Sequence, residues 1–251
     1  MVGFQANSTA AKAGYKLYTP TFLEVGKATA STTYTVKPIA ITGTVPNGSD
    51  SSYRISLQRL KADGGAQGSV LYWKDYDTSE TQHVGPGWCT GVGTAIQTVQ
   101  IQPGEGIMIK YPEGCENCTM QFSGELNQED AYIALRDGYT LLGNQQPMQL
   151  NVNQIVPTST DPELYPVPNG SDTTTRISIQ RLTPTGGTQG SVLFWKDYDK
   201  SATSHVGPGW CTGIGTTVQN VMLEPGEAVL VTCHDPNVAQ ILMKCPAAAV
   251  K

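Results

Sequence analysis

A long internal repeat constrains this chain more than any other feature of its sequence. Residues 45–105 recur at residues 167–227 with a constant offset of 122 and no gap, and 42 of the 61 aligned positions are identical. The run HVGPGWCTG is among the segments that return unchanged. Each half of the chain has the usual size of one domain, so we predict two homologous domains, residues 1–126 and 127–251.

The repeated segment divides into short pieces that alternate as β-strands do. Residues 54–60 alternate apolar and polar side chains, and residues 69–76 are apolar at their centre, as in a central strand. Where the copies differ inside these strand-like pieces, residues of similar volume mostly replace one another, as Ile179 replaces Leu57. We therefore predict an all-β fold with one β-sandwich-like domain in each half.

Composition and charge narrow the class of protein. Charged residues make up 15% of the chain, and the formal net charge is -5, so there is no basic surface for a phosphate backbone. No run of residues approaches the length of an apolar membrane-spanning helix. We expect neither nucleic acid nor membrane insertion, and the abundance of small polar and β-branched residues favours an extracellular β-rich protein.

The cysteines suggest a compartment. Six are candidates for disulfide bonds: Cys89, Cys115, Cys118, Cys211, Cys233 and Cys245. The last two flank a segment that could fold into adjacent strands, and Cys115 and Cys118 could close a tight loop or one of them could pair with Cys89. A zinc site made of Cys115, Cys118, Cys89 and His83 is the weaker alternative, because the sequence has no second CxxC and no HxxxH. Disulfides would imply an oxidising compartment, so we expect a secreted or surface protein.

The ends of the chain suggest how molecules could join. Residues 239–244 occupy the place in the second copy that residues 119–124 occupy in the first, and residues 3–7 match residues 124–127. If the strand that ends one domain opens the next, the same junction between subunits would give a head-to-tail filament. The candidates for polymer contacts are Val2, Phe4, Ile241, Leu242 and Met243.

Aromatic and acidic residues of the repeat support an alternative function. Trp88 and Trp210 follow Gly-Pro-Gly and are either core residues or exposed anchors that stack on a sugar or a neighbouring chain. Together with Asp75 and Asp197 they would form two sites of a tandem carbohydrate-binding module or adhesin that binds surface glycans.

The sequence gives weaker evidence for metal binding and for catalysis. Asp75 and Asp77 share a strand face and could hold calcium, but Lys74 beside them favours ordinary surface pairing. Cys89 and His83 lack the surroundings of a Cys-His nucleophile. We therefore assign no catalytic or metal residues, expect no cofactor, and do not expect an enzyme.

The strands that begin Gly-Tyr at residues 14 and 138, the WKDYD strands and the Pro-Gly-Glu turns resemble tandem β-domain repeats of secreted and surface proteins of Gram-negative bacteria. That resemblance implies an exported structural or adhesive role and carries no catalytic residues. With the duplication, it leads to our main expectation, a structural subunit of an extracellular or surface homopolymeric filament that is pilus-like and has itself as partner.

Overall fold

The structure, a computed structural model, is built almost entirely of antiparallel β-strands. It describes residues 2–7, 13–19, 34–35, 39–43, 45, 49–61, 63–101, 105–115, 117–125, 130–144, 146, 148–158, 176–235, 238 and 240–245. The helical element within these residues is one turn of 3₁₀ helix, η1 (Val152–Gln154). None of the helices found in the described residues has the length and apolar character needed to span a bilayer. The predicted all-β class is confirmed.

Residues 1–126, here called copy one, contain three sheets of antiparallel strands. The five-stranded sheet has the order β2 (Gly14–Tyr18), β9 (Ile107–Tyr111), β5 (Ser56–Leu60), β6 (Ala66–Ser79), β7 (Gln82–Cys89). The three-stranded sheet has the order β1 (Val2–Asn7), β10 (Thr119–Glu125), β4 (Ala40–Thr42). A short pair joins β3 (Tyr34–Thr35) to β8 (Gln100–Ile101).

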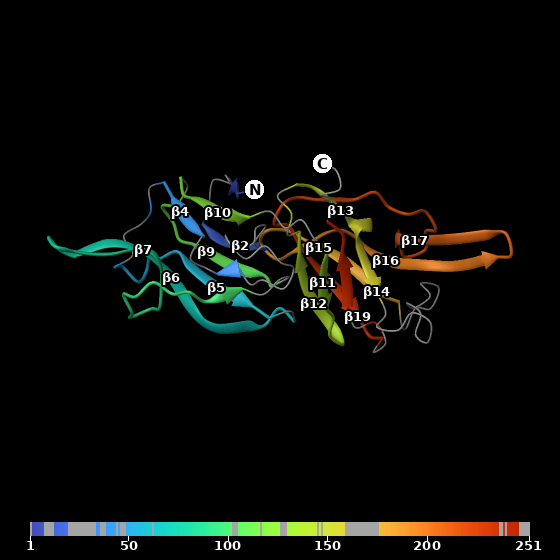
Figure 1. Ribbon diagram of the computed structural model, residues 1–251, viewed down its shortest axis with the longest axis horizontal. Coiled ribbons are helices and arrows are strands. Elements are labelled where there is room, and N and C mark those ends of the chain that lie inside the picture. The colour runs from blue at the N-terminus through green and yellow to red at the C-terminus, as the bar shows by residue number, and fades with distance from the viewer. Residues whose placement is uncertain are drawn as a thin grey trace.

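Residues 127–251, here called copy two, repeat this topology (Figure 1). The five-stranded sheet has the order β12 (Gly138–Gly143), β19 (Ala228–Cys233), β15 (Ser178–Leu182), β16 (Thr188–Ser201), β17 (Ser204–Thr212). The three-stranded sheet has the order β11 (Ala131–Ala134), β20 (Gln240–Met243), β14 (Ile155–Thr158). A short pair joins β13 (Leu150–Asn151) to β18 (Met222–Leu223).

Each copy encloses its own core between its sheets. In copy one, β9 buries Ile107, Ile109 and Tyr111 and leaves the residues between them on the opposite face, which is the period of two expected of a strand. A tryptophan pair occupies the same place in both cores: the rings of Trp73 and Trp88 are 5.4 Å apart, edge to face, and copy two repeats this geometry. Substitutions between the copies have therefore preserved the packing of both cores.

The strand pairings correct one detail of the sequence alignment. β1 pairs with β10 in copy one, and β11 pairs with β20 in copy two, so the counterpart of residues 3–7 is β11 rather than residues 124–127. The predicted sharing of one strand by the end of the first domain and the start of the second is therefore wrong. β10 belongs to copy one alone, and the boundary predicted at residue 126 falls between β10 and β11.

The two copies meet through equivalent residues on the outer faces of their five-stranded sheets, and this contact is here called the junction. It is an apolar cluster of Leu17, Leu60, Met108, Leu141, Leu182, Ala228 and Leu230. Leu17 of β2 and Leu141 of β12 occupy matching places after Gly-Tyr, and the backbone N–H of Leu17 donates to the carbonyl of Pro184 in the other copy. Such a contact between equivalent surfaces is the arrangement found across a twofold axis.

Two small residues allow the copies to approach closely at the junction. A Cβ built on Gly143 would lie 1.8 Å from the Oγ1 of Thr19, which holds the matching place in copy one. A Cβ on Gly106 would lie 2.5 Å from a methyl carbon of Leu141. Larger residues at either glycine would force the copies apart.

Candidate functional site

Each copy extends a two-stranded ribbon beyond its sheet, here called the arm (residues 74–87 and 196–209). In copy one, β6 pairs with β5 as far as Tyr72 and continues with β7 alone to the turn between Ser79 and Gln82. The arms lie at opposite ends of the molecule (Figure 1). A two-stranded ribbon is only marginally stable by itself, so side-chain interactions on the arm matter.

A histidine lies between two aspartates on each arm. In copy one, Nε2 of His83 is 2.7 Å from Oδ1 of Asp75, and Nδ1 is 2.7 Å from Oδ1 of Asp77. Copy two repeats the arrangement with distances of 2.7 and 2.8 Å among its equivalent residues, His205, Asp197 and Asp199. Only the doubly protonated imidazolium can donate to both carboxylates at once.

The charges of this cluster favour the protonated histidine. The hydrogen bond that His83 donates to Asp77, followed by the one to Asp75, raises the pKa of His83 above its ordinary value. The pKa of His205 is raised in the same way by Asp199 and then Asp197. The cluster of one histidine and two aspartates on each arm is here called the clamp. The histidine side chains are about half exposed, so each clamp is a pH-dependent surface interaction across the two strands of an arm.

A buried lysine fixes the loop that follows each arm. Lys74, at the base of the arm, is 1% exposed, and its ammonium donates to the carbonyls of Gly91 at 3.0 Å and Gly93 at 2.6 Å. Arg54 also donates to the Gly91 carbonyl, at 2.8 Å. Burial lowers the pKa of Lys74. These contacts hold residues 90–94, here called the pinned loop of copy one.

The pinned loop of copy two, residues 212–216, has the same construction. Lys196 donates to the carbonyls of Gly213 at 3.0 Å and Gly215 at 2.6 Å. At the middle of the two loops stand Val92 and Ile214, with exposed fractions of 101% and 102%. Each copy therefore holds a fully exposed aliphatic side chain on a loop fixed by a buried charge.

A pocket of about 300 Å³ opens at the junction, between β2 of copy one and the strand ends of copy two. Its apolar wall comes from Leu17, Leu182, Pro184, Pro225 and Ala228. Its polar lining comes from Lys16, Arg181, Gln189, Glu224 and Glu227. The pocket therefore combines an aliphatic surface with charged groups.

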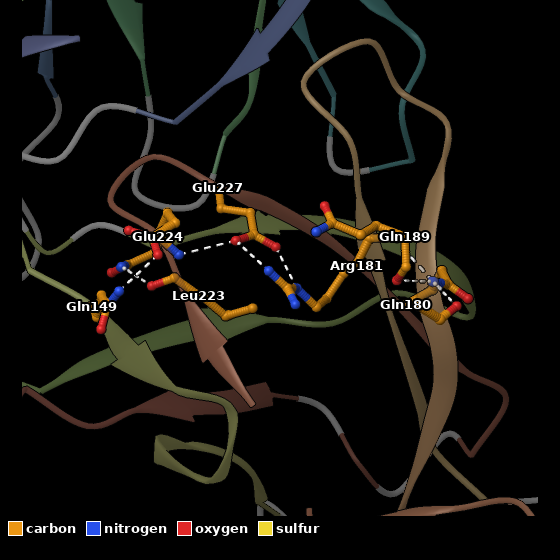
Figure 2. Close-up of polar contacts among 9 residues, drawn as sticks. Gln149, Gln180, Arg181, Gln189, Leu223, Glu224 and Glu227 are labelled. Atoms are coloured by element: carbon orange, nitrogen blue, oxygen red, sulfur yellow. Dashed lines mark hydrogen bonds and ion pairs between the residues drawn. The ribbon is translucent and has the colours of Figure 1, made fainter. Parts of the chain in front are cut away.

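An ion pair between Arg181 and Glu227 forms part of the lining of this pocket, and Figure 2 shows the two side chains and their polar contacts. Nε and Nη2 of Arg181 donate to the two carboxylate oxygens of Glu227 at 2.5 and 2.9 Å. The backbone N–H of Glu224 also donates to Glu227, and Gln149 donates to the Glu224 carboxylate at 2.7 Å. The paired carboxylate raises the pKa of Arg181. These groups hydrogen-bond to one another, which fixes their positions, and one arginine with two glutamates leaves this wall with a net negative charge.

The two tryptophans predicted as binding anchors are core residues. Trp88 is 1% exposed, Trp210 is equally buried, and their indole N–H groups donate to the carbonyls of Ile39 and Ile155. The exposed-anchor interpretation is therefore wrong, because these rings lie on inward-facing positions of β7 and β17. The predicted Asp75 and Asp197 are at the surface, where each is bound to its histidine as described above.

The structure does not show the predicted disulfide framework. All six cysteines lie in the described residues, and no disulfide joins any of them. Burial raises the pKa of the thiols of Cys89, Cys211 and Cys233, and the Cys89 thiol donates to the carbonyl of Thr94. The described residues likewise contain no cluster of three or more metal-ligating side chains suited to a metal ion. The cysteines therefore no longer support the expected oxidising compartment.

The C-terminal strand does not offer an edge for polymerisation. β20 is flanked by β11 and β14, and Ile241 and Met243 are 0% and 2% exposed in the core of copy two. Leu242 is half-buried on the other face of the strand. The backbone of Val2 and Phe4 pairs with β10 within copy one, and the side chains of these two residues lie outside the described part of the chain. β20 is therefore not free to pair with a neighbouring molecule, whereas β1 lies at an edge of its sheet and a contact through residues 2–7 stays a prediction.

Sequence reasoning missed the pinned loops and the junction. The signal for the loops was present, because Lys74 and Lys196 are the charged residues that follow apolar runs at the same place in both copies. The signal for the junction was the Thr19 and Gly143 pair, which stand at matching positions after the Gly-Tyr strands. Only the structure shows that these two residues touch.

In comparisons with known proteins, no family model, no curated protein and no solved structure matches this chain.

Proposed function

We propose that this protein is a non-enzymatic structural subunit that assembles with copies of itself into a filament at the cell surface or outside the cell. The observation that carries this proposal is the placement of two equivalent arms at opposite ends of the molecule, each with its clamp and its pinned loop. A molecule that presents the same features at both ends can contact two neighbours.

The assembly contacts in this proposal differ from those that the sequence suggested. Because β20 lies inside its own sheet, subunits would join through the surfaces of the folded copies rather than by exchange of terminal strands. The junction within the chain brings equivalent surfaces together, and contacts of that kind close rather than propagate. Growth of a filament therefore needs a second contact, one that joins two different surfaces of neighbouring molecules.

Two observations argue against the other functions considered. The thiol of Cys89 has a raised pKa, whereas a nucleophilic cysteine requires a lowered one, and His83 is bound to aspartates. A carbohydrate-binding module would need exposed aromatic rings on which a sugar stacks, and Trp88 and Trp210 are buried.

The extracellular location now rests on composition and on the resemblance to surface proteins alone.

The test is assembly of the purified full-length chain over a wide range of concentrations. Sedimentation velocity should show species that grow with concentration, and negative-stain electron microscopy should show filaments. A single monomeric species up to the highest concentration attainable would overturn the proposal. A glycan array run on the same preparation would then decide whether the carbohydrate-binding alternative holds.

A further inference from the structure

The pinned loops carry the most exposed of the large apolar side chains in the described part of the chain. Val92 and Ile214 project fully into solvent, and Ile96 and Val218, four residues later, are 45% and 39% exposed. Single exposed aliphatic residues are common on protein surfaces. Here the two exposed positions, 92 and 96 in copy one and 214 and 218 in copy two, hold aliphatic residues in both copies.

Divergence between the copies makes this retention informative. Where exposed positions on the arms differ between the copies, unlike residues replace one another, as in Thr78 to Lys200 and Glu80 to Ala202. By contrast, the fully exposed Val92 is matched by Ile214. A surface position under no constraint from packing has therefore kept a β-branched aliphatic side chain, which indicates that the side chain is buried in some contact.

The loop that displays the side chain is built to be rigid. Burial of the Lys74 ammonium is costly, and it is offset by hydrogen bonds to the carbonyls on both sides of Val92. The backbone N–H of Gly93 donates to the Thr90 hydroxyl, which closes the turn. A side chain held in this way loses little conformational freedom when it binds, and this favours its use as a contact.

The junction pocket matches such a side chain in size and chemistry. Its volume of about 300 Å³ exceeds that of the roughly 150 Å³ apolar cavities that hold benzene, so an aliphatic side chain and part of its loop fit. The pocket wall includes Leu17, Leu182, Pro184 and Ala228.

The four charged residues of the pocket lining have partners within the chain. Arg181 and Glu227 pair with each other, and the Glu224 carboxylate accepts from Gln149. The Lys16 ammonium lies over the ring of Tyr111, 5.8 Å from its centroid. The pinned loops, residues 90–94 and 212–216, contain no charged residue, so insertion would bury no unpaired charge from the loop.

We infer that the exposed aliphatic side chain of a pinned loop on one molecule, Val92 or Ile214, inserts into the junction pocket of a second copy of this chain. The contact joins two different surfaces and is therefore heterologous, and a heterologous contact whose rotation does not close a ring generates an open filament. This inference rests on the proposed function and identifies the surfaces through which assembly takes place.

The test places a diazirine-bearing aliphatic amino acid at position 92 and, in a second protein, at position 214. Each full-length protein is mixed with a ¹⁵N-labelled unmodified chain, irradiated under assembly conditions and analysed by mass spectrometry. The expected result is crosslinks between differently labelled chains that join the loop to residues 181–189 or 224–228. Intermolecular crosslinks only to other segments would overturn the inferred contact.

A variant tests the same contact without a photoreactive group. The double substitution Val92→Ser and Ile214→Ser should weaken assembly at least tenfold without changing the fold, because both side chains are exposed in the monomer. The control Tyr132→Ser removes an aromatic side chain that is 61% exposed on β11 and should leave assembly unchanged.

The outcomes distinguish the contact from the proposed function. Filaments that form equally well with both serine substitutions and crosslink elsewhere would refute the contact and leave the filament proposal standing. Absence of both assembly and intermolecular crosslinks would overturn both. Crosslinks to the pocket segments, together with weakened assembly of the double serine variant, would establish the contact.

Discussion

Gly143→Ala tests the close approach of the two copies at the junction. The added Cβ would lie 1.8 Å from Oγ1 and 2.2 Å from Cβ of Thr19, whose side chain is buried and short. An ordinary contact begins near 3.4 Å, so the backbones must separate by about 1.6 Å or Thr19 must leave its site. Overpacking of this kind costs about 1–3 kcal/mol. For a chain of this length we expect the melting temperature to fall by about 2–12 °C.

The assay is calorimetric or urea unfolding of the dilute full-length protein, with Gly213→Ala as control. A Cβ on Gly213 meets only the ring of Phe194, at 3.5 Å, so the control should change stability by less than about 1 kcal/mol. Adding Thr19→Gly to Gly143→Ala should restore most of the loss, because the two residues are in contact. Equal effects of the two alanine variants, or the absence of any restoration by Thr19→Gly, would refute the proposed packing of the junction.

Three further predictions concern the arms, the loops and the cysteines. The folded-state pKa values of His83 and His205 are raised, so the clamps stabilise the arms fully below the ordinary histidine pKa of about 6.5 and lose this contribution as the pH rises through the raised values. Amide exchange of the arms should therefore become faster over that pH range. Histidine pKa values of about 6.5 or lower, measured by NMR, would contradict this prediction. Lys74→Met should leave the carbonyl of Gly93 without this donor and the carbonyl of Gly91 with Arg54 alone, and so speed amide exchange and proteolysis of the loop. Unchanged protection would show that the loop does not depend on the lysine. Reducing agents should not change the melting temperature, and a thiol reagent should modify the half-buried Cys245 before the other cysteines; a fall in melting temperature on reduction would reveal a disulfide.

The repeat and its alternation were enough to predict the all-β class. Leu57 and Ile179 are both fully buried in β5 and β15, as expected of positions that exchange only similar residues. The same reasoning could not place Trp88, because Gly-Pro-Gly before it is typical of a turn. In the structure this segment lies within β7 at the sheet edge, where proline is tolerated and Trp88 reaches the core.

Contacts between distant parts of the chain could not be predicted from the sequence. Spacing alone allowed Cys233 and Cys245 to pair, but a disulfide also requires facing Cβ atoms, which depend on how β19 and β20 are placed in different sheets. The pocket is formed by residues more than 150 positions apart, such as Leu17 and Leu182. Alternation places each residue on a face of a strand, but it does not say which outer face meets another sheet.

The residues of the junction also explain why the two copies are joined in one chain. A contact of copy one with another copy one would place Thr19 against Thr19 where Gly143 now makes room. A contact of copy two with another copy two would replace Gly106 with Ala228, and its Cβ would lie about 2.5 Å from the methyl carbon of Leu141. The junction therefore favours unlike copies, and the covalent link supplies the unlike copy at high effective concentration. Since this surface is then fully used within the chain, any assembly of whole molecules must use surfaces that the junction leaves exposed, which include the pinned loops and the junction pocket.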